Sequence, residues 1–246
     1  MMRARGPPWL IVESFWNLMK HRADRQDVKC RAMDHHLVED SNYTIYPVIL
    51  SVPEERKTLT GRQKVAYLSK LARQAGRISA QRQGADIGEF AKNENGVPAP
   101  CCGYHWSISH KSEYVGGVVA PFPIGLDIEK IRPFSSGLFE RTGTNAEWRL
   151  IDSNPQILFF RYWTSKEAVL KAEGKGIEEL SKCRILKIRD ENHLMVAYNG
   201  RQWLIEHFFF DHHVASVVCN GSSIRWAIFD GKVAIPELPI NDPVKK

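Results

Sequence analysis

The alternation of apolar and polar residues along this 246-residue chain predicts both helices and strands. Apolar side chains recur near the 3.6-residue helical period in residues 60–81, where Thr60 is the candidate cap, and again in residues 156–173. A shorter helix is expected at 145–152. Apolar runs rich in β-branched and aromatic residues predict strands at 43–52, 104–108, 114–120 and 124–128. Similar runs predict an antiparallel meander in the second half, at 194–197, 202–210, 214–218 and 224–229.

One proline and the two ends of the chain modify this outline. Pro47 lies inside the first predicted strand and indicates an edge strand, because proline has no N–H to donate to a ladder. Residues 1–40 lack a core-like pattern and predict a poorly structured N-terminal extension. The apolar patch within them has no small-residue cleavage site, so we expect no signal peptide. Residues 237–246 predict a loose tail.

Composition narrows the class of protein. No apolar run approaches the roughly 18 residues that a membrane-spanning helix needs, so we expect no membrane segment. The five cysteines form neither a CxxC pair nor a zinc spacing, which favours free thiols in a reducing, cytoplasmic compartment. The formal net charge of +6 predicts attraction to polyanions. The basic residues are scattered and form no recognised nucleic-acid module, so nucleic acid is not the expected partner.

The segment Gly125-Leu126-Asp127-Ile128-Glu129 alternates two carboxylates with two apolar side chains. Successive side chains of a strand point to opposite faces, so Asp127 and Glu129 point the same way, roughly 7 Å apart. A strand with alternating acidic residues is most often a solvated sheet face. That remains the simpler interpretation of this segment alone.

A second segment, WTSKEAVLKAEGKG, occupies residues 163–176. Glu167 and Lys171 lie one helical turn apart and share a face, which by itself most often means a surface ion pair. The Gly-Lys-Gly that follows predicts the end of the helix, since glycine readily adopts the left-handed cap conformation. Together the two segments offer three carboxylates beside lysines, a set that suits a hard divalent cation held against a polyphosphate.

A third segment, WSISHK at residues 106–111, lies upstream of both. The ordered set resembles the 4′-phosphopantetheinyl transferase superfamily. In that family (Asn/Ser)-x-Ser-His precedes Gly-(Ile/Leu)-Asp-(Ile/Val)-Glu and then Trp-(Ser/Thr)-x-Lys-Glu-(Ala/Ser)-x-x-Lys-x-x-Gly-x-Gly. Every position of these patterns is occupied here, in the same order. The length of the chain matches the long, Sfp-type branch.

The resemblance implies the fold. Long members are α+β proteins with two pseudo-symmetric halves, each a small antiparallel sheet packed on a long helix, and their active site lies in the cleft between the halves. We therefore expect an N-terminal half at 41–123 and a C-terminal half, carrying the metal site, at 124–236. The chain has no sequence repeat at a fixed period, so the pseudo-twofold rests on the resemblance alone. A monomer is expected.

The resemblance also implies the chemistry. Members transfer the 4′-phosphopantetheine group of coenzyme A to a serine of an acidic acyl or peptidyl carrier protein and release 3′,5′-ADP. Asp127, Glu129 and Glu167 are assigned to a Mg²⁺ site, in which Mn²⁺ can substitute. Glu167 is the candidate general base for the serine hydroxyl. Lys171 is the group expected to neutralise phosphate charge in the transition state.

The coenzyme contacts follow from the same resemblance. Ser109 and His110 match the coenzyme-binding Ser-His, with His110 expected at the 3′-phosphate, and Lys166 matches a lysine placed near the coenzyme. Arg62 and Lys64 are looser candidates for the same phosphate. For those two residues, a solvated helix face is an equal alternative.

One position departs from the family pattern. Many members carry Gly-Lys-Pro before the Ser-His segment, and that lysine contributes to the coenzyme site. This chain has Val97 at the lysine position, between Gly96 and Pro98. A nearby base, Lys92 or Lys111, is the candidate substitute.

Two functions of other classes remain as alternatives. One is a non-catalytic homologue that keeps the fold and docks carrier proteins. The other is a metal-dependent phosphoesterase built on the same carboxylates. The intact set of Asp127, Glu129, Glu167 and Lys171 argues against the first, because a homologue without activity has no need of all four. Appearance of 3′,5′-ADP together with a modified carrier separates the transferase from both.

Overall fold

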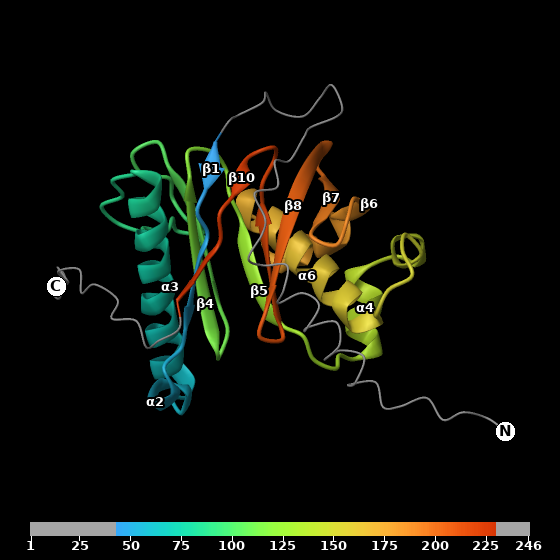
Figure 1. The fold of residues 1–246 in the computed structure, drawn as a ribbon, viewed down its shortest axis with the longest axis horizontal. Coiled ribbons are helices and arrows are strands. Elements are labelled where there is room, and N and C mark those ends of the chain that lie inside the picture. Colours follow the sequence, from blue (N-terminus) through green and yellow to red (C-terminus); the bar gives the residue numbers. More distant parts are fainter. Residues whose placement is uncertain (1–42, 230–246) are drawn as a thin grey trace.

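Two larger β-sheets, each flanked by one long helix, make up most of the chain in a computed structural model that describes residues 43–229 (Figure 1). The predicted N-terminal extension and loose tail lie outside these residues. The mixture of helices with largely antiparallel sheets confirms the predicted α+β class. The division into two pseudo-symmetric halves at residue 123 stays a prediction.

The first sheet has the strand order β11-β2-β4-β3. Its strands are β2 (Val48–Ser51), β3 (His105–His110), β4 (Tyr114–Ala120) and β11 (Ala227–Phe229). Helix α3 (Gly61–Gln83) covers it and confirms the predicted helix, with Thr60 at the N-cap position. A Cβ atom on Gly117 of β4 would lie 2.2 Å from the backbone nitrogen of Gly76, so only glycine permits this close approach of helix and strand.

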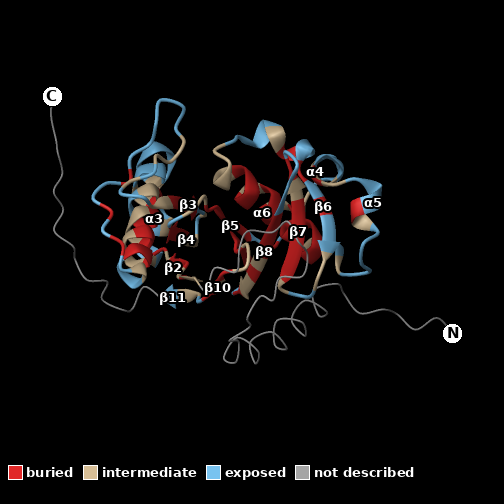
Figure 2. Cartoon of the chain, turned by 90° about the horizontal axis from the view of Figure 1, so that it is seen from above, coloured by how far each residue is buried: buried red, intermediate tan, exposed pale blue. Residues whose placement is uncertain are grey.

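The second sheet has the order β5-β9-β8-β7-β6 and is antiparallel throughout. Its strands are β5 (Leu126–Lys130), β6 (Arg184–Ile188), β7 (His193–Tyr198), β8 (Arg201–Phe210) and β9 (His213–Val218). Helix α6 (Pro155–Ala172) packs on this sheet and is buried along most of its length, whereas α3 keeps an exposed side (Figure 2). Gly174, with φ of 64°, provides the predicted left-handed end of α6.

Shorter elements complete the described chain: β1 (Thr44–Ile45), α2 (Glu54–Lys57), α4 (Ser136–Thr142), α5 (Asn145–Trp148), a 3₁₀ turn η2 (Ile177–Lys182) and β10 (Ser223–Ile224). Where the two sheets face each other, Ile49 and Ile128 pack with Phe210 and Ala215. No helix in the described part of the chain is both long enough and apolar enough to cross a membrane.

The expected edge strand at 43–52 is wrong in two respects. The strand is interrupted at residues 46–47, and β2 lies inside its sheet, between β11 and β4. Pro47 falls in the gap between β1 and β2, where its missing N–H breaks no ladder. Its carbonyl still accepts a hydrogen bond from the Ala227 N–H at 3.0 Å.

The predicted meander is correct for β7, β8 and β9, but the run at 224–229 does not continue it. That run forms β10 and β11, which pair in parallel with β1 and β2 in the N-terminal part of the chain. The meander instead begins at β6, which the sequence did not predict because its Arg184–Ile188 segment is largely exposed and contains an irregular register. The chain therefore returns to its first sheet before residue 229.

Candidate active site

The candidate site forms where the edge strands of the two sheets meet. Strand β5 is an edge strand, and its outward N–H groups need partners other than a neighbouring strand. The side chains of β3 supply them: Ser107 Oγ accepts from the Leu126 N–H at 3.1 Å, and Ser109 Oγ accepts from the Ile128 N–H at 3.2 Å. Two serine hydroxyls thus fasten β5, with its carboxylates, to the first sheet.

The glycine at the start of β5 is required by the helix behind it. A Cβ atom on Gly125 would lie 1.8 Å from the carbonyl oxygen of Ala168 in α6. No side chain fits in that space, so glycine lets the strand carrying Asp127 lie directly against the helix carrying Glu167.

Asp127 is 4% exposed and holds the centre of the site. Its Oδ1 accepts from Ser109 Oγ at 2.9 Å and from Lys171 Nζ at 2.7 Å. Its Oδ2 is buried without any hydrogen-bond partner. A buried carboxylate oxygen without a donor is costly, so this atom is a ready ligand for a cation.

Glu129 and Glu167 surround Asp127 from a strand and a helix. Burial, followed by the charge of Asp127, raises the pKa of Glu129, while Lys111 lies 2.6 Å from its Oε1 and opposes the shift. Burial and Asp127 also raise the pKa of Glu167, against the opposing charge of Lys171. These mutual effects mean that the three carboxylates are close enough to interact electrostatically and are partly shielded from solvent.

The three carboxylates are not yet gathered as tightly as ligands of one ion. Among the described residues, the group of three whose ligand atoms all lie within 4.8 Å of one another is a different one, formed by Glu113, Asp211 and His213. In the candidate site, the ammonium groups of Lys171 and Lys111 contact Asp127 and Glu129 instead. The oxygen donors and the unpartnered Asp127 Oδ2 nevertheless fit a hard divalent cation.

A group of basic side chains lies beside the carboxylates. His110, at the end of β3, has its pKa lowered by burial and then by the charges of Lys171, Lys111 and Lys92. Lys92, from the long loop after α3, likewise has its pKa lowered by burial, by Arg73 and by Lys171. The positive charges of Lys171, Lys111 and Lys92 near His110 favour a bound anion there.

Two predicted coenzyme residues lie at the N-terminus of α3. Arg62 is exposed and Lys64 is half-buried. Within residues 43–229, no hydrogen bond or ion pair joins either side chain to the carboxylates. Their assignment stays a prediction.

Lys166 does not join the candidate site. Its side chain is 2% exposed, and its Nζ donates to Glu147 Oε1 and to the Thr142 carbonyl, both at 2.7 Å. Glu147 also accepts from the Ile185 N–H, so the pair ties α6 to α4, α5 and β6. Sequence reasoning missed Glu147, although Thr144 and Glu147 form a capping box whose spacing is readable in the sequence.

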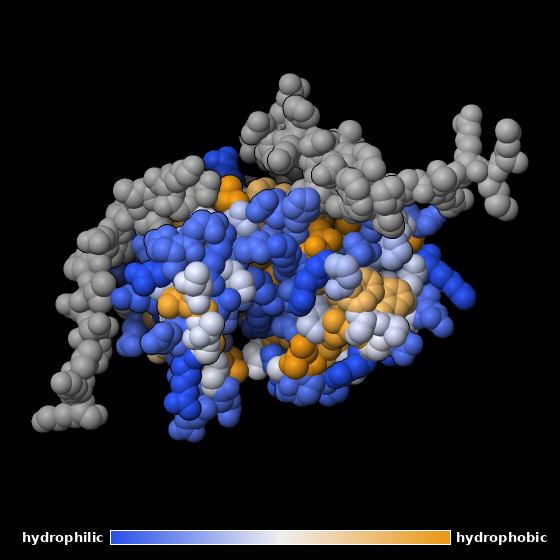
Figure 3. Space-filling model, turned by 90° about the horizontal axis from the view of Figure 1, so that it is seen from below, coloured by the Kyte–Doolittle hydropathy of each residue, from blue (hydrophilic) through white to orange (hydrophobic). Residues whose placement is uncertain are grey.

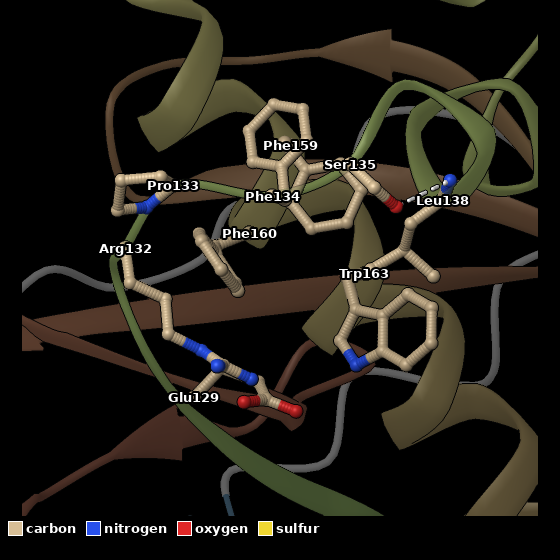
Figure 4. Close-up of a pocket in the computed structure, with 9 residues that line it drawn as sticks. All are labelled: Glu129, Arg132, Pro133, Phe134, Ser135, Leu138, Phe159, Phe160 and Trp163. Atoms are coloured by element: carbon tan, nitrogen blue, oxygen red, sulfur yellow. Dashed lines mark hydrogen bonds between the residues drawn. The ribbon is translucent and has the colours of Figure 1, made fainter.

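A pocket of about 250 Å³ opens beside Glu129 (Figure 4). Arg132 lies with Glu129 at one end, and its charge opposes the rise in the pKa of that carboxyl. The rings of Phe134, Phe159, Phe160 and Trp163 line the rest, with Phe134 stacked on Phe159 at a centroid distance of 4.0 Å. The sequence analysis did not predict this pocket. One signal for it is Phe134, an aromatic residue soon after the strand that carries Asp127 and Glu129. The periodicity of a strand says nothing about residues beyond its end.

Fold and site together define a class: an α+β protein with buried carboxylates and cations at the junction of two sheets. Residues 123–220 match the sequence model of the 4′-phosphopantetheinyl transferase superfamily. This match confirms the predicted resemblance over these residues.

Similar proteins support the long, Sfp-type branch. The 4′-phosphopantetheinyl transferase psf-1 of Bacillus pumilus is 35% identical over 94 residues, which are 36% of this chain and 40% of the relative. Sfp of Bacillus subtilis is 35% identical over 77 residues, 30% of this chain and 34% of the relative. HetI of Nostoc sp. is 46% identical over 68 residues, 25% of this chain and 29% of the relative. The matched part spans about 40% of the length of psf-1.

Proposed function

We propose that this chain transfers the 4′-phosphopantetheine group of coenzyme A to a serine of an acyl or peptidyl carrier protein and releases 3′,5′-ADP. One observation carries the proposal: the carboxylates of Asp127, Glu129 and Glu167 meet the cationic group around His110 and Lys171 at the junction of the sheets. Carboxylates beside cations suit a substrate whose pyrophosphate needs both a metal and positive side chains.

We assign the three carboxylates to a Mg²⁺ site. The buried, unpartnered Oδ2 of Asp127 supports this assignment, because it is an oxygen donor with no other partner. When bound, Mg²⁺ would neutralise negative charge on the pyrophosphate of coenzyme A. Lys171, which now contacts Asp127 Oδ1, is free to turn toward phosphate, since its side chain is 27% exposed.

Glu167 is the proposed general base. Its pKa is raised by burial and by Asp127, which makes the carboxylate a better proton acceptor than an ordinary glutamate. The nucleophile belongs to the carrier, whose serine hydroxyl would give its proton to Glu167 as the oxygen attacks the phosphorus. Lys171 would then stabilise charge that builds on the transferring phosphate.

The coenzyme end of the site is proposed around His110. Lys92 and Lys111 lie within electrostatic reach of this histidine, which supports them as substitutes for the lysine replaced by Val97. Ser109 is 5% exposed, and its hydroxyl already contacts Asp127 and the Ile128 N–H, so we propose that it positions the metal carboxylate and does not bind coenzyme directly.

The carrier protein is proposed to approach from the side of the aromatic pocket. Its serine must come close to Glu129 and Glu167, and the pocket beside Glu129 offers apolar surface with one cation, Arg132, at its end. This combination suits a small acidic helical domain with an apolar patch. We further propose a monomer in the cytoplasm, a location supported by the four free cysteines among the described residues.

Mass spectrometry of several apo-carriers tests the function. Each carrier is incubated with the protein, Mg²⁺ and coenzyme A, and the transferase predicts a gain of one phosphopantetheine together with 3′,5′-ADP. Chelation of Mg²⁺ should abolish the gain, and Mn²⁺ should restore it. A non-catalytic homologue would bind carriers without modifying them, and a phosphoesterase would cleave coenzyme A without modifying them. Either outcome would overturn the proposal.

A further inference from the structure

Two turns meet at one edge of the molecule, beside the end of β5 that carries Glu129. The β3–β4 turn contributes Glu113, and the β8–β9 turn contributes Asp211, followed at the start of β9 by His213. One ligand atom from each of these residues lies within 4.8 Å of the others. Both turns lie at the lower edge of the sheets in Figure 1, and Figure 3 shows this side as largely hydrophilic with separate hydrophobic areas.

His213 has an unsatisfied nitrogen that points into the cluster. The side chain is fully buried, and its Nδ1 lies 2.6 Å from the backbone carbonyl oxygen of Asp211. A carbonyl oxygen only accepts hydrogen bonds, so Nδ1 carries the proton. The other nitrogen, Nε2, is buried without a hydrogen-bond partner, and the nearest carboxylate oxygen, Glu113 Oε2, is 3.7 Å away. In the neutral ring, a lone pair on Nε2 therefore faces a carboxylate.

The two carboxylates are each held by one oxygen and leave the other available. Lys130 Nζ contacts Glu113 Oε1, and Tyr114 Oη donates to Asp211 Oδ2 at 2.8 Å. The histidine is held in the same way through Nδ1. Outer hydrogen bonds to the carboxylates and to the second ring nitrogen are the arrangement that orients metal ligands in proteins.

We propose that Glu113, Asp211 and His213 form a second metal site, which binds one divalent transition ion of the zinc class. One imidazole nitrogen and two carboxylate oxygens suit Zn²⁺ or Co²⁺ better than Mg²⁺, which prefers all-oxygen ligands. Three protein ligands leave the remaining position to water.

The proposed ion would join the two sheets. It would fix the β3–β4 turn, whose Lys111 contacts Glu129, against the β8–β9 turn. Its role would be structural, and none of its three ligands belongs to the Mg²⁺ site proposed for transfer.

Zinc titration of the full-length protein tests the site. Protein stripped with a chelator is dialysed and titrated with Zn²⁺ in excess Mg²⁺. We expect one tight equivalent in the wild type and in the control Asp127→Asn. Binding should be at least about 100-fold weaker in Glu113→Gln and Asp211→Asn, since even loss of an outer contact weakens metal binding by about 10–100-fold. Bound Co²⁺ should give the visible absorption of a low-coordinate site in the wild type and in Asp127→Asn, but not in the two turn variants.

Thermal unfolding gives an independent readout, because a ligand of the folded state raises its melting temperature. Zn²⁺ should raise the melting temperature of the wild type and of Asp127→Asn, and leave that of Glu113→Gln and Asp211→Asn unchanged. The two conservative variants lie in different turns. If only one of them unfolds cooperatively, and is therefore folded, that variant alone is sufficient to test the site. Absence of Zn²⁺ binding by the wild type would overturn the proposal. Equal binding by the turn variants, or loss of binding in Asp127→Asn, would do the same.

Discussion

Two lysines of helix α6 each pair with a carboxylate from another element, Glu147 of α5 and Asp127 of β5, and the two pairs differ in their surroundings. Lys166 and Glu147 are 2.7 Å apart, with side chains 2% and 5% exposed. Lys171 and Asp127 are also 2.7 Å apart, but the Lys171 side chain is 27% exposed. The first pair is enclosed by protein donors and acceptors, whereas in the second one carboxylate oxygen has no partner.

The comparison separates a lysine that holds the fold from one that can act on a substrate. Burial of a charged pair stabilises the protein only while both charges are present, so neither partner of the first pair can turn away. In the second pair, a partly exposed lysine can exchange a carboxylate for a phosphate at smaller cost than a fully enclosed one. One short sequence segment, residues 163–176, therefore holds one lysine enclosed in the core and one that is partly exposed beside the candidate carboxylates.

The largest expected effect is on the enclosed pair. Lys166→Met or Glu147→Gln should lower the free energy of unfolding by about 3–5 kcal/mol, because the remaining group is left without its partner in the core. Urea denaturation at neutral pH measures this loss. The turnover of the molecules that remain folded should be close to that of the wild type. A normal stability with a large fall in turnover would instead mean that Lys166 acts on coenzyme A.

The pair of Lys171 and Asp127, the open pair, should respond in the opposite way, with a large loss of turnover and a small loss of stability. Asp127→Asn keeps the shape of the side chain but removes the charge that attracts a cation, so kcat should fall by about 100- to 1,000-fold. The loss of stability should be smaller than in the Lys166 variants. A coupled assay for 3′,5′-ADP measures the first effect and urea denaturation the second. Wild-type turnover by Asp127→Asn, or full activity of the wild type in excess chelator, would contradict the assigned metal role.

The difference between the two lysines was only partly readable in the sequence. The helical pattern predicts α6, and i,i+4 spacing correctly places Glu167 and Lys171 on one face. Lys166 directly precedes Glu167 and so points about 100° away around the helix, toward the core. Family resemblance alone placed it near the coenzyme, and that assignment stays a prediction.

Other parts of the site depend on contacts between distant segments. Ser109 was predicted as a coenzyme contact. Its hydroxyl instead donates to Asp127 Oδ1 and accepts from the Ile128 N–H, and both of these residues belong to the other sheet. The sequence pattern around β3 does not predict that β5, an edge strand of the other sheet, lies beside it. The same limit explains β10 and β11, whose parallel pairing with β1 and β2 joins segments at opposite ends of the described chain. Local periodicity predicts a strand but not its partner.

A smaller effect is expected for the cationic group beside the open pair. His110→Ala should raise the KM for coenzyme A about 10-fold, the size of one hydrogen bond to a charged group, with little change in kcat. Dephospho-coenzyme A, which lacks the 3′-phosphate, should lose little further activity with the variant. Glu167→Ala is the matched control and should reduce kcat with both donors. Equal loss of turnover with both donors in His110→Ala would instead give the histidine a structural or catalytic role.

The smallest effect concerns the carrier protein. If the net charge of +6 attracts an acidic carrier, the KM for carrier should rise a few-fold as ionic strength increases, because the screening length falls from about 30 Å at 0.01 M to about 8 Å at physiological salt. The kcat should change less, since the open pair acts after docking. The aromatic pocket provides the matched control: Phe134→Ala removes apolar contact area, so it should raise the KM by a similar factor at every salt concentration. A wild-type KM that does not change with salt, combined with a large effect of Phe134→Ala, would mean that the carrier docks through apolar contacts. The positive charge would then serve the phosphates of coenzyme A alone.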